Sequence, residues 1–272
     1  MTKDLVVKCS DCGMVHTSHA PTEEELQAYY ANYPVVSTLS PITRTRYLEL
    51  LDRFEAFRKN NRIIDVGCGS GLFLQVAAER GWEVHGTEYG SIAIDACRSK
   101  GIDIIEGALD PKNYPPGHFD VVCSFEVLEH LIDPAGEVAR MGTILRDGGL
   151  LYATTPNFNC LARRAAPSDW SVANYPEHLS YFTPRTLRRL FGDIGMRPLW
   201  LGTSGFSVAR WLSGRRTGAV RANAQARQEQ LRADMEYKPH MKLAKRVLNF
   251  LLHSFSLGDS LKGAFIRSTQ RG

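Results

Sequence analysis

The chain has 272 residues, of which 43% are hydrophobic and 23% are charged, and its formal net charge is +4. This length allows one large domain with appendages, and the composition is that of an ordinary globular protein. No apolar run approaches the roughly 20 residues of a membrane-spanning helix. The N-terminus lacks the apolar stretch of a signal peptide, and the six cysteines form no disulfide framework, so we expect a cytoplasmic protein.

Residues 1–58 are predicted to form a knuckle-like segment followed by two lid helices. The pattern Cys9-Ser10-Asp11-Cys12-Gly13 lies between two short apolar segments and is typical of half a zinc knuckle. Zinc takes four ligands, a second Cys-x-x-Cys is absent, and His16 and His19 follow so closely that a tetrahedral site would be cramped. We therefore favour a metal-free vestige of a knuckle over a zinc site and assign no metal ligand.

Two helices are predicted next. Thr22 caps the first, and the acids after it suit the positive end of the helix dipole. The second covers about Ile42 to Arg58 and carries an apolar face. We expect both to brace the segment that follows. The tyrosines at the end of the first helix either close over a ligand or fill the core.

The stretch that follows predicts a strand, a glycine turn and a helix. Arg62 to Val66 suit a buried parallel strand, Gly67, Gly69 and Gly71 follow at alternate positions, and residues 72–80 are good helix formers. Glycine adds no Cβ and tolerates positive φ, so such a turn brings bare backbone close to a ligand. The alternative is a turn that needs its glycines only for geometry.

The next predicted strand, Trp82 to Glu88, ends in an acid. Glu88 lies 17 residues after Gly71, close to the position where a nucleotide-binding βαβ unit carries the carboxylate for two ribose hydroxyls. The alternative is an ordinary solvated strand end. The spacing favours the binding role.

Strands and helices alternate through the middle of the chain. Further strands are predicted over 102–107, 119–125 and 150–155, with helices over 91–100 and 133–145. This alternation predicts an α/β fold with a parallel, doubly wound sheet. Ligands of such folds bind at the carboxyl ends of the strands.

Five segments together resemble the class I S-adenosylmethionine-dependent methyltransferases in order and spacing. They are Asp65 to Gly71, Glu88, Phe119 to Val122, Glu126 to His130 and Leu145 to Gly149. The resemblance covers about residues 61–157. A nicotinamide-dependent oxidoreductase is the alternative within enzymes, but its fingerprint is Gly-x-Gly-x-x-Gly, whereas this chain has Gly-x-Gly-x-Gly.

The resemblance implies a Rossmann-like, doubly wound, seven-stranded sheet with six parallel strands and an antiparallel seventh. The core would consist of residues 59–203 and 258–270, with strands at 196–202 and 260–267. A helical insert, residues 204–257, would interrupt it before the last strand.

The cofactor implied by the resemblance is S-adenosyl-L-methionine, with S-adenosyl-L-homocysteine as product. The implied cofactor-binding residues are Asp65, Gly67, Cys68, Gly69, Gly71, Glu88, Tyr89, Ala108, Leu109, Phe125 and Glu126. Asp65 and the glycine turn would line the amino-acid end, and Glu88 the ribose. Many relatives carry an acid where this chain has Ala108, so the usual hydrogen bond to the adenine amino group is not expected.

Two histidines are candidates for a general base. The loop from Asn174 to Leu187 resembles a His-Leu-x-x-Phe-Thr/Ser-Pro loop of methyltransferases that tailor sugars, quinones and other small metabolites. His178 is our first choice of base, against a role in pinning the loop. His130 is either a second base or a structural histidine. A neutral histidine can accept a hydroxyl proton near pH 7.

The expected activity is O-methylation of a hydroxyl on a sugar or related small metabolite. Nitrogen or carbon acceptors, and a catalytically idle protein of the same fold, are the alternatives. Ser124-Phe125-Glu126-Val127 stands where many amino-group and nucleic-acid methylators carry Asn/Asp-Pro-Pro-Tyr, so we expect no nucleic-acid partner.

The predicted insert is rich in basic residues and contains two predicted helices. Between Arg210 and Arg246 ten basic residues stand against three acids. Residues 221–235 predict a polar helix, and residues 240–253 predict an unusually apolar one. The apolar helix could roof the substrate pocket, form a homodimer contact or lie on a membrane surface.

Overall fold

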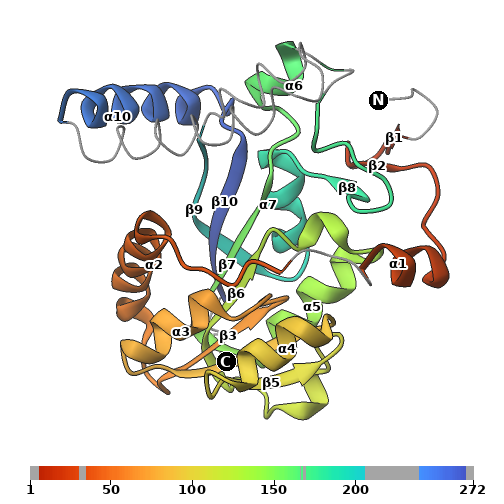
Figure 1. Ribbon diagram of the computed structural model, residues 1–272. Coiled ribbons are helices and arrows are strands. Elements are labelled where there is room, and N and C mark those ends of the chain that lie inside the picture. The colour runs from red at the N-terminus through yellow and green to blue at the C-terminus, as the bar shows by residue number, and fades with distance from the viewer. Residues whose placement is uncertain (1–5, 31–34, 166, 168–169, 206–238, 268–272) are drawn as a thin grey trace.

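The structure is a computed structural model that describes residues 6–30, 35–165, 167, 170–205 and 239–267. A central sheet runs through it, with α3 (Leu72–Glu79) and α4 (Ser91–Arg98) on one face and α5 (Pro134–Ile144) and α7 (Pro184–Gly192) on the other (Figure 1). This is the layered arrangement expected of a doubly wound fold.

The main sheet has seven strands in the order β5-β4-β3-β6-β7-β10-β9. Their bounds are β3 Arg62–Val66, β4 Glu83–Glu88, β5 Asp103–Glu106, β6 Phe119–Phe125, β7 Leu145–Pro156, β9 Met196–Ser204 and β10 Ser260–Arg267. Strand β10 pairs antiparallel with both neighbours, while the pairs among β3 to β7 are parallel. The predicted fold, six strands in one direction and an antiparallel seventh, is confirmed.

Each face of the sheet buries its own apolar cluster. Helix α2 (Pro41–Phe54), which continues as the short 3₁₀ helix Glu55–Phe57, joins α3 and α4 over one face. On the other face the Phe191 ring of α7 stacks on Phe265 of β10, with 4.0 Å between centroids. Full burial of such side chains contributes about 1.5–3 kcal/mol each.

Strand β7 is longer than predicted. The helix before it ends at Ile144, and the strand begins at Leu145, so the turn expected at residues 146–149 lies inside the strand. Leu145 pairs with Phe119, and the register with β6 then shifts, so that Val121 faces Leu150. Gly148 has φ +68°, which suits glycine, so the four residues form an irregularity within one strand instead of a break.

A buried ion pair fastens the segment before β3 to the sheet. Asp120 is fully buried, and its Oδ1 accepts a hydrogen bond of 2.5 Å from Arg146 Nε. Its Oδ2 accepts from the backbone N–H groups of Lys59 and Asn61 at 2.8 and 2.7 Å. The carboxylate therefore has several partners, as a buried charge requires.

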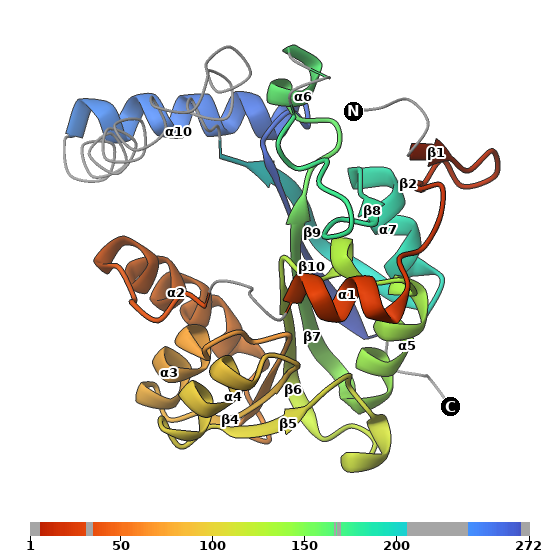
Figure 2. The same cartoon turned by 45° about the vertical axis from the view of Figure 1, so that its right-hand side comes forward.

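The N-terminal hairpin pairs with a distant segment. Strands β1 (Val6–Lys8) and β2 (Val15–Thr17) join β8 (Ser180–Tyr181) in a second sheet, with Val15 opposite Tyr181 (Figure 2). Helix α1 (Glu23–Tyr30) follows, and Thr22 caps it as predicted, since its Oγ1 accepts from Glu25 N. No pattern in the sequence predicted this second sheet.

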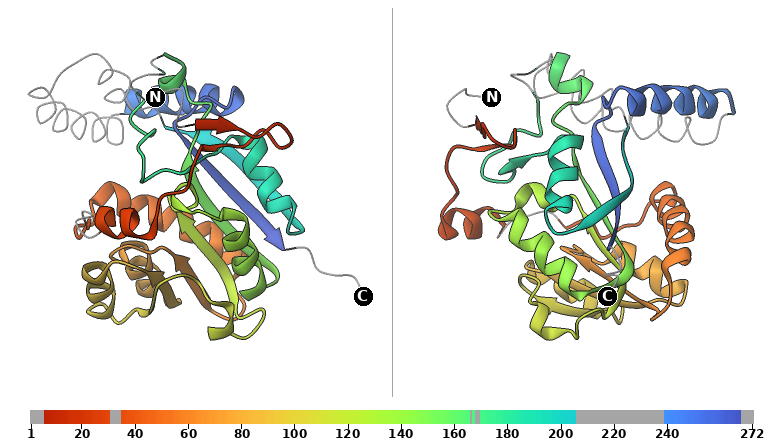
Figure 3. Two further views of the ribbon diagram at one scale, coloured as in Figure 1. Left: turned by 90° about the vertical axis from the view of Figure 1, so that its right-hand side faces the viewer. Right: turned by 180° about the vertical axis from the view of Figure 1, so that it is seen from behind.

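The apolar helix of the insert is α10 (Pro239–Ser254), at one end of the β9–β10 pair (Figure 3). Thr203 Oγ1 of β9 donates to Leu252 O of α10 at 2.8 Å. The polar helix predicted at 221–235 lies outside the described residues. None of the described helices has the length and hydropathy needed to cross a bilayer. Within the described residues, the remaining helices are α6 (Leu161–Ala165) and the 3₁₀ turns Pro111–Asn113 and Leu128–His130.

Candidate active site

The glycine turn follows the central strand β3 at its carboxyl end. Gly67, Gly69 and Gly71 all have positive φ, +75°, +54° and +71°. A Cβ on Gly67 would lie 2.6 Å from Val127 Cγ2, and one on Gly71 would lie 2.4 Å from Ile102 Cδ1, whereas one on Gly69 would meet nothing within 4 Å. The outer glycines are therefore required by packing, and Gly69 faces open space, where backbone can approach a ligand.

Asp65 is buried beneath this turn with an unused acceptor. Its strand β3 pairs with β4 and β6, the residue is 3% exposed, and its Oδ1 has no hydrogen-bond partner in the described part of the chain. Burial raises the pKa of Asp65 well above its usual value, and the charge of Glu88 raises it further. A cationic group at the turn would donate a hydrogen bond to Oδ1 and would balance the negative charge of the carboxylates. The ammonium group of S-adenosylmethionine has that chemistry.

Glu88 ends β4 beside the turn. Its Oε2 accepts from Gly69 N at 2.8 Å, and its Oε1 accepts from Tyr89 N and Gly90 N at 2.9 and 3.0 Å. A carboxylate has about four acceptor sites, so little capacity is left for the two ribose hydroxyls that the sequence predicts. Binding both would require Glu88 to exchange at least one of these backbone bonds.

Two cysteines support the turn from below. Cys68 Sγ lies 3.8 Å from Cys97 Sγ, and Cys97 Sγ donates to Gly69 O at 3.2 Å. A Cβ on Gly86 would lie 2.7 Å from Cys68 Sγ, so β4 needs a glycine here. The expected contact of Cys68 with a cofactor is thus a backbone contact, because its side chain points into the packing.

The other predicted cofactor residues lie at the ends of neighbouring strands. Phe125 ends β6 and packs against Phe73 and Tyr47, at 4.9 and 6.3 Å between ring centroids. Glu126 follows with φ +55°, a strained conformation for a non-glycine residue that functional sites often contain. Beyond them, Tyr89 is 70% exposed, Ala108 is exposed and Leu109 is buried.

The loop with His178 is fastened to the segment after β6. Leu179 N donates to Glu129 O at 2.7 Å, which places His178 beside His130, and the two rings meet edge to face with 4.7 Å between centroids. His178 Nδ1 lies 2.6 Å from Val172 O. A carbonyl only accepts, so Nδ1 carries the proton and Nε2 is the basic nitrogen of the neutral ring. The hydrogen bond that pins the loop also prepares His178 as a base.

His130 is a weak base. Burial, with a further contribution from His178, lowers its pKa to about 4. A base with so low a pKa has little tendency to take a hydroxyl proton. The lowered pKa therefore favours His130 as a neutral ring beside His178.

Glu129 completes this group, although the sequence analysis assigned it no role. It is 2% exposed, Thr155 Oγ1 donates to its Oε2 at 2.9 Å, and burial raises its pKa well above the usual value. One ligand atom each from Glu129, His130 and His178 lie within 4.8 Å of one another, so the three could hold a metal ion. The Glu129-His130 pair was visible in the sequence, but its contact with the distant His178 loop was not.

The knuckle segment supplies none of the three side chains of this group. Cys9 and Cys12 stand in the hairpin turn, where Cys12 Sγ accepts from Met14 N, and His16 Nδ1 bonds Thr17 O at 2.8 Å. Among the described residues, neither of the two clusters of metal-binding side chains includes these cysteines.

Comparison with known proteins identifies relatives. A family model described as a methyltransferase domain matches residues 42–199. A ubiquinone biosynthesis O-methyltransferase of Thiobacillus denitrificans is 34% identical over 148 residues, 50% of this chain and 64% of that protein. The matches to the first curated relatives span between 45% and 64% of their length.

Solved structures share the fold. An S-adenosylmethionine-dependent methyltransferase from Archaeoglobus fulgidus superposes with a TM-score of 0.55 at 17% identity, over 83% of this chain and 93% of that one. Phosphoethanolamine N-methyltransferase 2 of Haemonchus contortus, solved with S-adenosyl-L-methionine, has a TM-score of 0.53 at 16% identity, over 86% of this chain and 54% of that one.

Proposed function

This chain belongs to the methyltransferase domain family and is a class I S-adenosylmethionine-dependent methyltransferase, and on that premise we propose that it methylates a hydroxyl oxygen of a small metabolite with His178 as general base. The observation that carries the proposal is the hydrogen bond from His178 Nδ1 to Val172 O, which makes Nε2 the proton acceptor. Proton removal by a positioned base contributes about 10²–10⁴-fold to such a step.

The cofactor seat is proposed at the glycine turn. The residues assigned to it are Asp65, Gly67, Cys68, Gly69, Gly71, Glu88, Tyr89, Ala108, Leu109, Phe125 and Glu126. When bound, S-adenosylmethionine supplies a methyl group on a sulfonium, which is already a strong donor. The chain's own contribution is then to neutralise the cation with Asp65, to place the backbone of Gly69 against it, and to hold the acceptor in line.

The acceptor is the finer part of the proposal. The curated relatives are named for ubiquinone biosynthesis and for O-methylation, which supports oxygen over nitrogen or carbon as the acceptor atom. Precursors of quinones are therefore the first compounds to test, and sugar hydroxyls, expected from the His178 loop, come second.

The experiment combines an acceptor screen with a base variant. Purified protein is incubated with labelled methyl donor and a panel of phenolic, sugar and amine acceptors. His178→Ala should lower turnover on the accepted compound at least about tenfold while the affinity for S-adenosylhomocysteine stays nearly constant. His253→Ala, an exposed histidine on α10, is the matched control.

Three results would change the proposal. Unaltered turnover in His178→Ala would assign this histidine to the loop alone. Loss of activity with a chelator, restored by a divalent cation, would instead assign Glu129, His130 and His178 to a metal ion. Purified protein that retains no S-adenosylhomocysteine in native mass spectra would favour an idle protein.

Helix α10 is proposed as a self-association surface. Its described apolar side chains are largely exposed although β9 anchors the helix: Leu243, Val247, Leu248, Phe250 and Leu251. A contiguous exposed apolar face of this kind marks an interaction site. Light scattering should give a homodimer that Phe250→Glu dissociates. A monomer that floats with anionic vesicles would instead indicate a membrane contact.

A further inference from the structure

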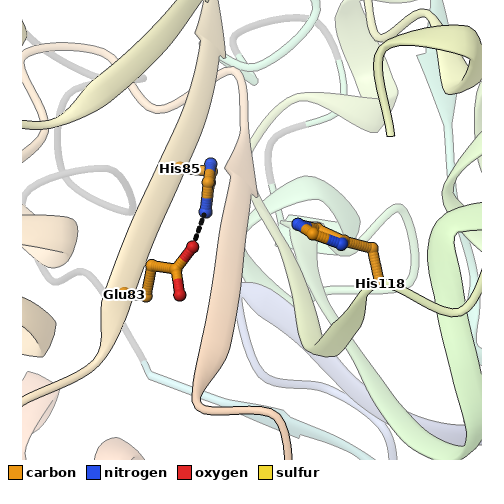
Figure 4. Close-up of side chains that lie close together, drawn as sticks. All are labelled: Glu83, His85 and His118. Atoms are coloured by element: carbon orange, nitrogen blue, oxygen red, sulfur yellow. Dashed lines mark hydrogen bonds and ion pairs between the residues drawn. The ribbon is translucent and has the colours of Figure 1, made fainter. Parts of the chain in front are cut away.

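Four polar side chains gather at the end of the sheet opposite the glycine turn. Glu83 and His85 lie at the start of β4, Asp103 is the first residue of β5, and His118 immediately precedes β6. Parallel strands begin at a common edge, so the topology brings these residues together. In Figure 4 the His118 ring points back toward His85 and Glu83. None of the four belongs to the proposed cofactor seat or to the His178 group.

The His85 ring is held in place from several sides. It is 7% exposed and packs edge to face against the rings of Tyr114 and Phe119, at 5.9 and 5.1 Å between centroids. Its Nδ1 lies 2.9 Å from Asp103 Oδ2, and its Nε2 lies 3.3 Å from Glu83 Oε1. Both ring nitrogens therefore face carboxylate oxygens.

This arrangement calls for a positive centre between His85 and Glu83. With Asp103 accepting the proton of Nδ1, the neutral ring presents the lone pair of Nε2 to an oxygen that also carries lone pairs. Two such acceptors repel each other unless a proton or a cation lies between them. A proton would use only His85 and Glu83, whereas a metal ion would also use His118. One ligand atom from each of Glu83, His85 and His118 lies within 4.8 Å of the other two.

We propose that Glu83, His85 and His118 bind a divalent transition-metal ion, with Asp103 as the positioning residue for His85. Zinc bonds of about 2.0–2.1 Å put neighbouring ligand atoms of a tetrahedral site about 3.3 Å apart. The Nε2 to Oε1 distance of 3.3 Å already has this value. The hydrogen bond from Nδ1 to Asp103 is the carboxylate–histidine contact that orients metal-binding histidines.

The ligand set selects the class of ion. Two imidazoles and one carboxylate suit Zn²⁺, Ni²⁺ or Cu²⁺ better than Mg²⁺ or Ca²⁺, which prefer oxygen. Arg62 Nε donates to both oxygens of Glu83 at 3.1 Å, so the ion would share this carboxylate with a guanidinium. With neutral histidines, Glu83, Asp103 and Arg62 leave one negative charge, which favours a cation. Half-buried His118 leaves room for water as a further ligand.

The role expected for such an ion is to stabilise the fold. It would tie β4 to the segment that enters β6, at the end of the sheet opposite the glycine turn. Binding to the folded state alone raises the melting temperature with ligand concentration.

Isothermal titration with ZnCl₂ tests the site in chelator-treated protein. The background carries Cys9→Ser and His130→Ala, which remove a ligand from the knuckle segment and one from the cluster of Glu129, His130 and His178. We expect a single zinc ion per chain. His118→Ala and Glu83→Gln should each lower the zinc affinity at least about tenfold. Asp103→Asn should lower it about 10–100-fold, the usual effect of losing an orienting partner. His253→Ala should leave the affinity unchanged.

The outcome is unambiguous when folding is checked by circular dichroism. Zinc should also raise the melting temperature of the background protein and not that of its His118→Ala form. Absence of zinc binding in the background, or binding that His118→Ala and Glu83→Gln leave unchanged, would overturn the proposal. The His85–Glu83 contact would then be bridged by a proton.

Discussion

Asp65→Asn is the substitution that separates cofactor binding from stability most sharply. The asparagine keeps the shape of the side chain and removes its charge. A hydrogen bond to a charged group contributes about 1.5–3 kcal/mol, which corresponds to about 10–150-fold in affinity. We therefore expect the affinity of the Asp65→Asn protein for S-adenosylhomocysteine to be lower than that of the wild type by about this factor.

The same substitution should stabilise the cofactor-free protein at neutral pH. The folded-state pKa of Asp65 is raised above its ordinary value of 3.8, so the native protein holds this proton more tightly than the unfolded chain. Ionisation of Asp65 therefore costs stability as the pH rises from 3.8 toward the folded-state pKa. Asparagine cannot ionise, so Asp65→Asn removes the cost of a buried negative charge at this position.

The assay is urea unfolding of cofactor-free protein at pH 4 and pH 8, with isothermal titration of S-adenosylhomocysteine. The stability gain of Asp65→Asn should be present at pH 8 and small at pH 4. Asp120→Asn is the matched control, because it breaks a buried ion pair with Arg146. It should lower the free energy of unfolding by about 3 kcal/mol or more without lowering the cofactor affinity. Equal cofactor affinity in Asp65→Asn, or lower stability at pH 8, would refute the assignment of Asp65.

Three further predictions concern the same region. Glu88→Ala should lower the affinity for S-adenosylhomocysteine about 10–100-fold and abolish discrimination against its 2′-deoxyribose analogue in titrations. Retained discrimination would contradict the ribose-binding role of Glu88. Gly71→Ala should cost about 2–4 kcal/mol in urea unfolding, because its Cβ would lie 2.4 Å from Ile102 at φ +71°, whereas Gly69→Ala meets no atom within 4 Å and should cost less; equal costs would be inconsistent with this packing. His130 has a pKa lowered from 6.5 to about 4, so it stays unprotonated in the fold while the unfolded chain gains a proton; wild type should lose about 3 kcal/mol between pH 7 and pH 4 through this residue, and His130→Gln should lose correspondingly less.

The sequence predicted the sheet well because its strands are local patterns. Arg62–Val66 and Phe119–Phe125 were predicted with the bounds that the structure has, since each is a short apolar run between turn signals. The turn at residues 146–149 was predicted wrongly, because a positive-φ glycine marks an irregularity in a strand as well as a chain reversal. Local pattern alone does not distinguish the two.

What the sequence could not predict depends on contacts between distant segments. The glycine turn and Glu88 lie within one βαβ unit, so their proximity follows from spacing. The contact of His178 with His130, and the hydrogen bond that sets the His178 tautomer, depend on where a long loop comes to rest. The cluster of Glu83, His85 and His118 likewise has no motif spacing, because the starts of two strands distant in the sequence supply it.

Under the proposed function, the N-terminal hairpin has a consequence for how the choice of acceptor could change. By pairing with Ser180 and Tyr181, it restricts the conformational freedom of the loop that carries His178. The hairpin makes no strand pair with the cofactor half of the sheet. Substitutions in β2 could therefore shift the proton acceptor relative to different hydroxyls while the methyl donor stays where it is. Selectivity and donor binding would then be separately adjustable properties of one chain.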